Sequence, residues 1–237
     1  MQFPAFIRRI LPGEVVHDFP VISLILANAV TIVLAILGNW DLTTVLFIYW
    51  SQGVIIGIFA VISMLGADTA ALAVDLDKPL KDLGRTQRCS TRHVWLYKSS
   101  LAGFFALHYG LFHWVYFSFL VESGIFGPVN FSDPGIWLSC GLFFANHLYS
   151  HIRYRHEGAQ GTGFIGEEFF SPYQRIIPMH MTIIFGSIVV TVLQIFGIQS
   201  TLPVLVLFLL LKTRSDISAH RIKHAQKEHP DEPVQDL

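Results

Sequence analysis

Long apolar runs separated by short polar stretches divide this sequence. A transmembrane helix needs about 20 mostly apolar residues, because the hydrocarbon core of a bilayer is about 30 Å thick. The pattern therefore predicts an all-α, polytopic membrane protein with six transmembrane helices. The expected spans are Val21–Gly38, Thr43–Leu65, Ser99–Val121, Pro134–Ile152, Pro172–Phe196 and Leu202 to about His220.

Two of these helices begin at ordinary capping signals. In "SDPGI", Asp133 is the expected N-cap and Pro134 occupies the first turn, where a missing N–H costs little. In "SPYQ", a capping box around Pro172 predicts the start of the fifth helix. The preceding "GTGFIG" matches a glycine-rich dinucleotide pattern, but no strand precedes it, so a flexible loop is expected.

The sixth apolar run is short for a bilayer. From Leu202 to Leu211 it gives only about 15 Å of helix. Continuation of the helix to about His220 aligns Lys212, Asp216 and His220 in one stripe with a spacing of four. Residues 1–225 are therefore expected to form a single six-helix transmembrane domain. Residues 226–237 are expected to be a disordered cytoplasmic tail.

Composition and charge agree with a membrane protein. Of the 237 residues, 52% are hydrophobic and 14% are charged, whereas soluble domains have about a quarter charged residues. With six spans, all sixteen Lys and Arg residues fall on the side that holds both termini. Because basic residues mark the cytoplasmic side, both termini are predicted to be cytoplasmic, in a multi-pass protein of the inner membrane. No stretch resembles a nucleic-acid motif, and the lipid bilayer is the expected partner.

Polar side chains converge toward the cytoplasmic half of this arrangement. The segment "GLFFANHLYSHIRYRHEG" carries His147 and His151 four residues apart, on one face of a helix. Up-and-down threading brings the ends of helices four and six and the start of helix five to the same leaflet, and His108 lies about 15 Å into helix three. The convergent groups are His108, His147, His151, His180, Asp216 and His220.

These six side chains are the candidate metal ligands. Ionisable groups inside a membrane are costly and usually face the bundle interior, and His nitrogen and Asp oxygen are common ligands of zinc and iron. Zinc is favoured over iron as the cofactor, and haem is less favoured. Three simpler interpretations stay open: interfacial solvation of His151, charge neutralisation of Lys212 by Asp216, and structural packing of His113 beside aromatic rings.

A metal-dependent hydrolase is the favoured function. Zinc with an open coordination position lowers the pKa of bound water to about 7. Asp216 would be the catalytic residue, as fourth ligand or general base, and a lipid or small amphipathic substrate would arrive laterally. The alternatives are a metal-ion or proton transporter, for which a kink at Pro178 would suit, a haem or redox membrane protein, and a structural protein.

Four segments, "FIYWSQGVIIGIF", "FFALHYGLFHWVYF", "PYQRIIPMHMTII" and "LLLKTRSDISAH", resemble a family of uncharacterised polytopic prokaryotic membrane proteins with a domain of unknown function. The resemblance extends from helix two to the end of helix six. It implies a common fold and a shared polar site, and it brings no known activity. An acid is frequent in that family at the position of Gln52. The family pattern includes His108, His180, Lys212, Asp216 and His220.

Overall fold

The computed structural model describes residues 19–82, 89–156 and 161–198, together with 204, 205, 207, 208, 211 and 212. Their regular structure is helical, and this described part contains no strand. The helices are α2 (Phe19–Leu37), α3 (Leu42–Gly66), α4 (Thr69–Asp82), α5 (Thr91–Glu122), α6 (Pro134–His156) and α7 (Gly161–Ile195). The expected all-α class is therefore confirmed for these residues.

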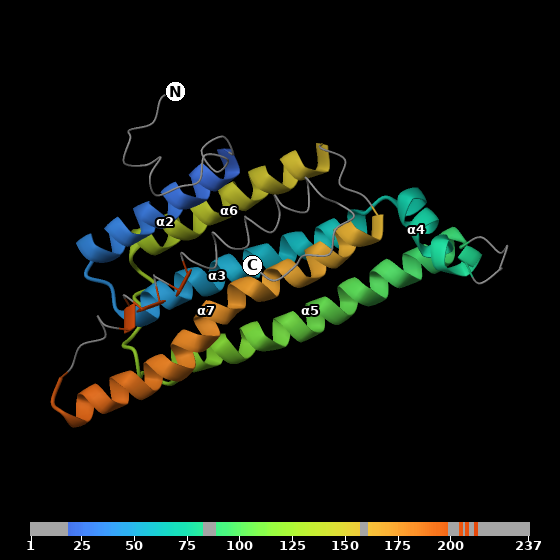
Figure 1. The fold of residues 1–237 in the computed structure, drawn as a ribbon. Coiled ribbons are helices and arrows are strands. Elements are labelled where there is room, and N and C mark those ends of the chain that lie inside the picture. The colour runs from blue at the N-terminus through green and yellow to red at the C-terminus, as the bar shows by residue number, and fades with distance from the viewer. Residues whose placement is uncertain are drawn as a thin grey trace, which may run out of the picture.

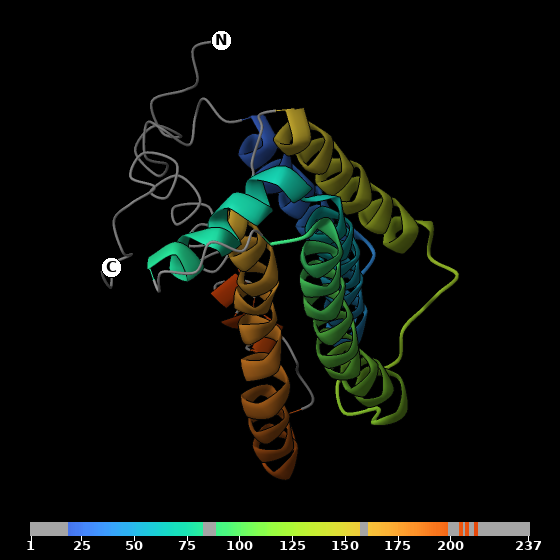
Figure 2. The same cartoon turned by 90° about the vertical axis from the view of Figure 1, so that its right-hand side faces the viewer.

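Helix α3 lies at the centre of the arrangement. It packs against α5, α6 and α7, and α2 packs against α6 on the outer side. The five long helices alternate in direction along the chain, so α5 and α7 run parallel to each other (Figure 1). Helix α4 lies across the end of the bundle where α3 ends and α5 begins, and it contacts α5 and α7 (Figure 2).

Three of the described helices are long and apolar enough to cross a membrane. They are Leu42–Gly66, Thr91–Glu122 and Phe164–Ile195. Helix α2 contributes a shorter apolar stretch, Ile22–Leu37. The sequence expectation of a membrane protein therefore holds in this coarser form. Most of the predicted sixth span lies outside the described residues.

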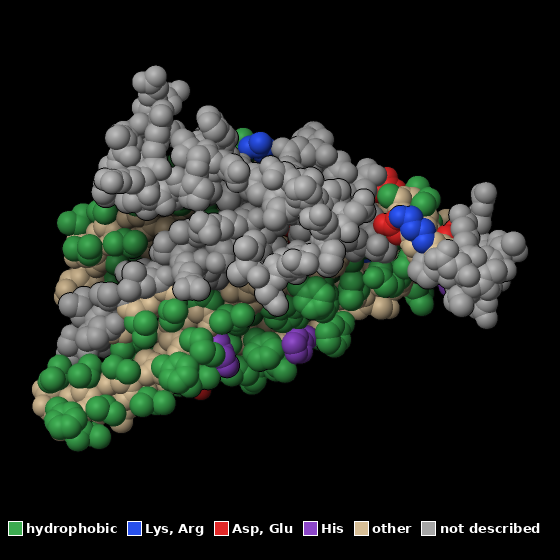
Figure 3. All heavy atoms as spheres, viewed as in Figure 1, with side chains coloured by type: hydrophobic (Ala, Val, Ile, Leu, Met, Phe, Trp, Pro, Cys, Tyr) green, Lys and Arg blue, Asp and Glu red, His purple; other side chains and the backbone are tan. Residues whose placement is uncertain are grey.

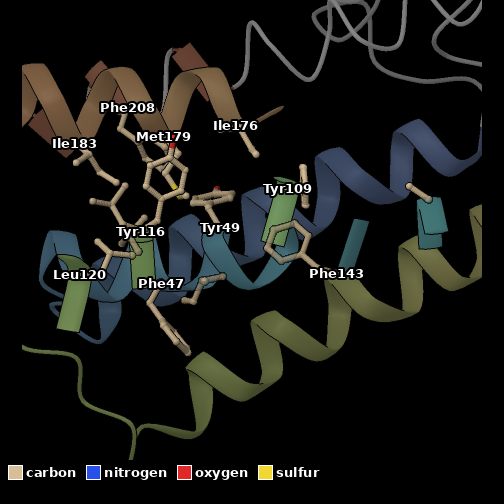
Figure 4. Close-up of a cluster of buried hydrophobic side chains, with 14 of the residues drawn as sticks. Phe47, Tyr49, Tyr109, Tyr116, Leu120, Phe143, Ile176, Met179, Ile183 and Phe208 are labelled. Atoms are coloured by element: carbon tan, nitrogen blue, oxygen red, sulfur yellow. The ribbon is translucent and has the colours of Figure 1, made fainter. Parts of the chain in front are cut away.

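The core is built from apolar and aromatic side chains around α3. Leu42, Leu46 and Ile48 in the first half of α3 are completely buried. The Tyr49 ring lies 5.8 Å from Phe143 of α6 and 5.1 Å from Phe208 of the sixth apolar segment, measured between centroids. Figure 4 shows Tyr49 and Phe208 within the same cluster as side chains of α5 and α7. The sixth apolar segment thus contributes to the core of the bundle.

The outward faces of the long helices are also apolar. On α5, Leu107 is 79% exposed and Trp114 is 66% exposed. In the coloured part of Figure 3, large apolar side chains cover much of the surface, with histidine side chains among them. Soluble monomers rarely expose large apolar surfaces, and contact with lipid would account for the composition of these faces.

Helix α7 corrects the predicted start of the fifth span. It begins at Gly161 and continues through Pro172 and Pro178, so the helix start expected at Pro172 and the flexible loop expected at "GTGFIG" are both wrong. Each proline removes a backbone hydrogen bond. Both prolines are buried, and packing against neighbouring helices can offset that loss in a membrane bundle. Helix α4 was likewise not predicted, because it falls between the expected spans Thr43–Leu65 and Ser99–Val121.

The predicted cap of α6 is confirmed and has a second role. Asp133 Oδ1 accepts the Gly135 N–H at 2.7 Å, while Oδ2 accepts the indole N–H of Trp40 at 2.5 Å. Loss of a capping carboxylate costs about 0.5–2 kcal/mol, typically near 1. We expect Asp133→Ala to lower the free energy of unfolding by about this amount, measured by thermal unfolding in detergent. Glu122→Ala, at an exposed position, is the control, and equal midpoints for the two variants would contradict this role.

Candidate functional site

The described part of the chain contains four of the six predicted metal ligands. His108, His147, His151 and His180 each form a hydrogen bond with a different neutral side chain. Among the described residues, no three His, Cys, Asp or Glu side chains are grouped so as to hold a metal ion. Asp216 and His220 lie outside the described residues. The convergence of all six ligands therefore stays a prediction.

Two of the histidines lie in the α3–α6 seam, defined here by Gln52, Ser63, His147 and His151. The Gln52 side-chain nitrogen lies 3.3 Å from His147 Nε2, and the Ser63 hydroxyl lies 3.1 Å from His151 Nδ1. Gln52 is 1% exposed and Ser63 is 8% exposed. The spacing of four in the sequence predicted that both imidazoles share one helix face, and their common packing against α3 confirms it.

The other two histidines lie in the α5–α7 seam, defined here by His108, Tyr116, Tyr173 and His180. His108 Nδ1 lies 2.8 Å from the Tyr173 hydroxyl. Tyr116 of α5 makes the reciprocal contact, with its hydroxyl 2.6 Å from His180 Nδ1 on α7. Each helix therefore supplies one histidine and one tyrosine to this seam.

His113 is a packed residue, as one of the alternatives in the sequence analysis suggested. It is 5% exposed, and its Nδ1 donates to the Tyr109 carbonyl at 3.0 Å. Its own carbonyl accepts the indole N–H of Trp50 at 2.8 Å. The Nε2 atom has no hydrogen-bond partner and lies over Gly53 of α3. These contacts fix the α3–α5 interface and leave no room for a ligand between the imidazole and α3.

Lys212 brings a buried cation close to the α3–α6 seam. It is 5% exposed, and its Nζ lies 5.2 Å from the centroid of the Tyr49 ring. Tyr49 precedes Gln52 by three residues on α3, so the two side chains lie on nearby faces of that helix. Because Tyr49 also contacts Phe143 of α6, Lys212 Nζ lies beside the part of α3 that packs against α6.

Sequence reasoning missed the tyrosine partners in the α5–α7 seam. A usable signal was present, because His108 and Tyr116 are eight residues apart and Tyr173 and His180 are seven apart. Both spacings keep two side chains on one helix face. What the sequence lacks is the register between α5 and α7, which decides which histidine meets which tyrosine.

The comparisons with known proteins give a family and no activity. No curated protein and no solved structure matches this chain. The family model described as "Family of unknown function (DUF6498)" matches residues 12–233. That match covers most of the chain, including both histidine seams, and it agrees with the resemblance to a domain of unknown function. The chain therefore belongs to this family of unknown function.

Proposed function

We propose that this protein is a six-span inner-membrane protein with both termini in the cytoplasm, and that it binds a divalent metal, zinc in preference to iron. Helix length supports a span at α6 in addition to the three long apolar helices, since the 23 residues of α6 extend over about 35 Å. The distribution of charge supports the orientation. Lys78 belongs to α4, Lys98 lies near the start of α5 and Arg153 near the end of α6, whereas Glu122 ends α5 and Asp133 directly precedes α6. In Figure 1 the start of α5 and the end of α6 lie toward the end capped by α4, and the end of α5 and the start of α6 lie toward the opposite end.

The buried position of Lys212 carries the metal-site proposal. Its Nζ lies over Tyr49, close to the α3–α6 seam with its buried hydrogen bond between Gln52 and His147. In a continuing helix, each four-residue step advances the stripe by about 6 Å. Asp216 and His220 would then follow along the same seam, toward His147 and His151. Four potential ligands of zinc would meet in a region of low dielectric near the cytoplasmic leaflet.

The surroundings of His147 fit the role of a ligand. A metal-binding histidine usually gives its second ring N–H to another polar group, which fixes the orientation of the ring. Gln52 is held in the interior with its amide nitrogen facing His147 Nε2. With the amide turned over, its oxygen would face the ring and accept such an N–H. The Ser63 hydroxyl, beside His151 Nδ1, can likewise accept an N–H from that ring. His108 and His180 have tyrosine partners in the other seam, so the proposed set rests on His147, His151, Asp216 and His220.

The chemistry that follows is hydrolysis of a lipid or a small amphipathic amide or ester. A zinc ion in this site would supply Lewis acidity. Asp216 would either complete the ligand set or take the proton from the attacking water. The apolar outer faces of the long helices suit a substrate that arrives from the bilayer rather than from water.

Metal content tests this proposal directly. Wild-type protein purified in detergent should keep roughly one equivalent of zinc after dialysis. His147→Ala and Asp216→Ala should each lose more than half of it, because each removes one ligand. His93→Ala is the matched control, since His93 is exposed and its imidazole contacts Ser90. A wild-type protein without metal, or equal zinc in all four proteins, would contradict the proposal.

A further inference from the structure

An exposed imidazole interrupts the apolar outer face of α5. His108 is exposed, and its neighbours on the same helix include Leu107 and Leu111, which are 79% and 58% exposed. Histidine side chains are visible on the apolar face in Figure 3. The residue lies about 15 Å along α5 from Lys98, near the middle of the apolar stretch. A polar group facing lipid at that depth is costly and points to a function.

The hydrogen bond to Tyr173 divides the roles of the two ring nitrogens of His108. Nδ1 lies 2.8 Å from the tyrosine hydroxyl, whereas Nε2 has no hydrogen-bond partner among the described residues. If the hydroxyl donates to Nδ1, Nε2 carries the hydrogen and is a donor; in the other tautomer Nε2 is an acceptor. His108 Nε2 can therefore act as either a donor or an acceptor toward a molecule in the bilayer.

Aromatic rings surround this imidazole. Phe104, one turn earlier on α5, lies 5.4 Å from the His108 ring with an interplanar angle of 11°. Phe112, one turn later, meets the ring edge-on at 5.1 Å. The Tyr173 ring of α7 lies 5.7 Å away, and Phe104 also stacks with Phe169 of α7 at 6.1 Å and 13°. His108 therefore lies among flat aromatic rings, and Phe104, Phe112 and Tyr173 are called the aromatic collar here.

We propose that the collar around His108 binds the head of a lipid-soluble quinone. A phospholipid phosphate stays at the interface, and an acyl chain has no polar atom at this depth. A quinone is a flat conjugated ring that is soluble in the bilayer, so it can stack against aromatic rings. Its carbonyl oxygen accepts a hydrogen bond from Nε2, and the hydroxyl of its reduced form donates to Nε2 in the other tautomer.

The second histidine of the seam provides a matched control. His180 forms the same kind of hydrogen bond with Tyr116 and is only partly exposed. Tyr116 lies eight residues beyond His108 on α5, about 12 Å along the helix. A single quinone ring cannot reach both imidazoles. His180→Phe should therefore leave the proposed site intact.

The probe for this proposal is decylubiquinone, titrated into protein held in phosphatidylcholine nanodiscs, with binding followed by quenching of tryptophan fluorescence. Wild-type quenching should saturate. The half-saturating concentration should rise about tenfold in His108→Phe, which keeps a ring in the collar but removes the hydrogen bond. It should rise a few-fold in Tyr173→Phe, because only the orientation of the imidazole is lost, and it should not change in His180→Phe.

Two results would overturn the proposal: wild-type quenching that does not saturate, or equal half-saturating concentrations in wild type and His108→Phe. Because His108 is exposed and phenylalanine suits the aromatic collar, the variant should fold, and an unchanged melting temperature would verify this. The zinc content of His108→Phe should equal that of wild type, so the outcome is independent of the proposed metal site. A decyl-substituted benzene without carbonyl groups should give no saturable quenching.

Discussion

Replacing Gly53 by alanine is expected to force α3 and α5 apart. A Cβ atom at this position would lie 2.5 Å from His113 Nε2, well inside van der Waals contact. The imidazole cannot swing aside easily, because its Nδ1 is hydrogen-bonded to the Tyr109 carbonyl and its ring centroid lies 4.3 Å from that of the Tyr109 ring. Movement of Gly53 would also strain the hydrogen bond from the Tyr109 hydroxyl to the Gly53 carbonyl, now 3.0 Å.

Overpacking of a core typically costs about 1–3 kcal/mol, and we expect Gly53→Ala to lie in the upper part of that range. The free energy of unfolding in mixed detergent micelles, from the midpoint and slope of an SDS titration, gives the measurement. Gly103→Ala is the control, because a Cβ at that position would have no atom within 4 Å apart from its chain neighbours and the backbone of its own helix turn. It should be neutral or stabilising by up to about 1 kcal/mol, since alanine favours helix. Equal losses in both variants would refute the packing role of Gly53.

The apolar pattern predicted most of the long helices because each must be both long and apolar. The expected span Thr43–Leu65 differs from α3, Leu42–Gly66, by one residue at each end. The expected span Val21–Gly38 is similarly close to α2, Phe19–Leu37. The start of α6 at Pro134 was also predicted correctly, because Asp133 supplies a local capping signal that does not depend on tertiary structure.

Helix α4 and the first turns of α7 were not predicted, because both are too polar to be identified as spans. Their helical structure depends on packing between elements. Helix α4 contacts α5 and α7, with Leu72 completely buried. Ile165, near the start of α7, is also completely buried. These contacts override the proline signal at Pro172, which on its own favours a helix start.

For the candidate site, the sequence predicted which side chains share a helix face, but it could not predict their partners. The spacing of four residues between His147 and His151 predicted that both side chains face one neighbouring helix, which is α3. The separation of His108 and His180 from that pair depends on the register between helices. That register is set by packing, for example of Tyr109 and His113 against Gly53, and single-sequence periodicity contains no information on it.

Replacing Lys98 by methionine is expected to loosen the attachment of α4 to the bundle. Lys98 is 2% exposed, and its Nζ donates to the Ala67 carbonyl at 2.9 Å, with the Thr69 hydroxyl at 3.5 Å. Ala67 directly follows the last residue of α3, so the cation lies at the negative end of the helix dipole. The ammonium group also lies 4.0 Å from the centroid of the Trp95 ring.

Methionine fills much of the same volume but leaves the Ala67 carbonyl without its donor, and an unsatisfied buried polar group costs about 1–3 kcal/mol. We therefore expect Lys98→Met to lower the free energy of unfolding by roughly 2–3 kcal/mol and to speed amide hydrogen exchange in residues 69–82, both measured in detergent. Lys78→Met is the control, because Lys78 is 70% exposed and pairs with Asp75 at the surface. Such a pair contributes under about 1 kcal/mol. If the two variants lost equal stability and exchanged equally in α4, Lys98 would not be the residue that holds α4 at the end of α3.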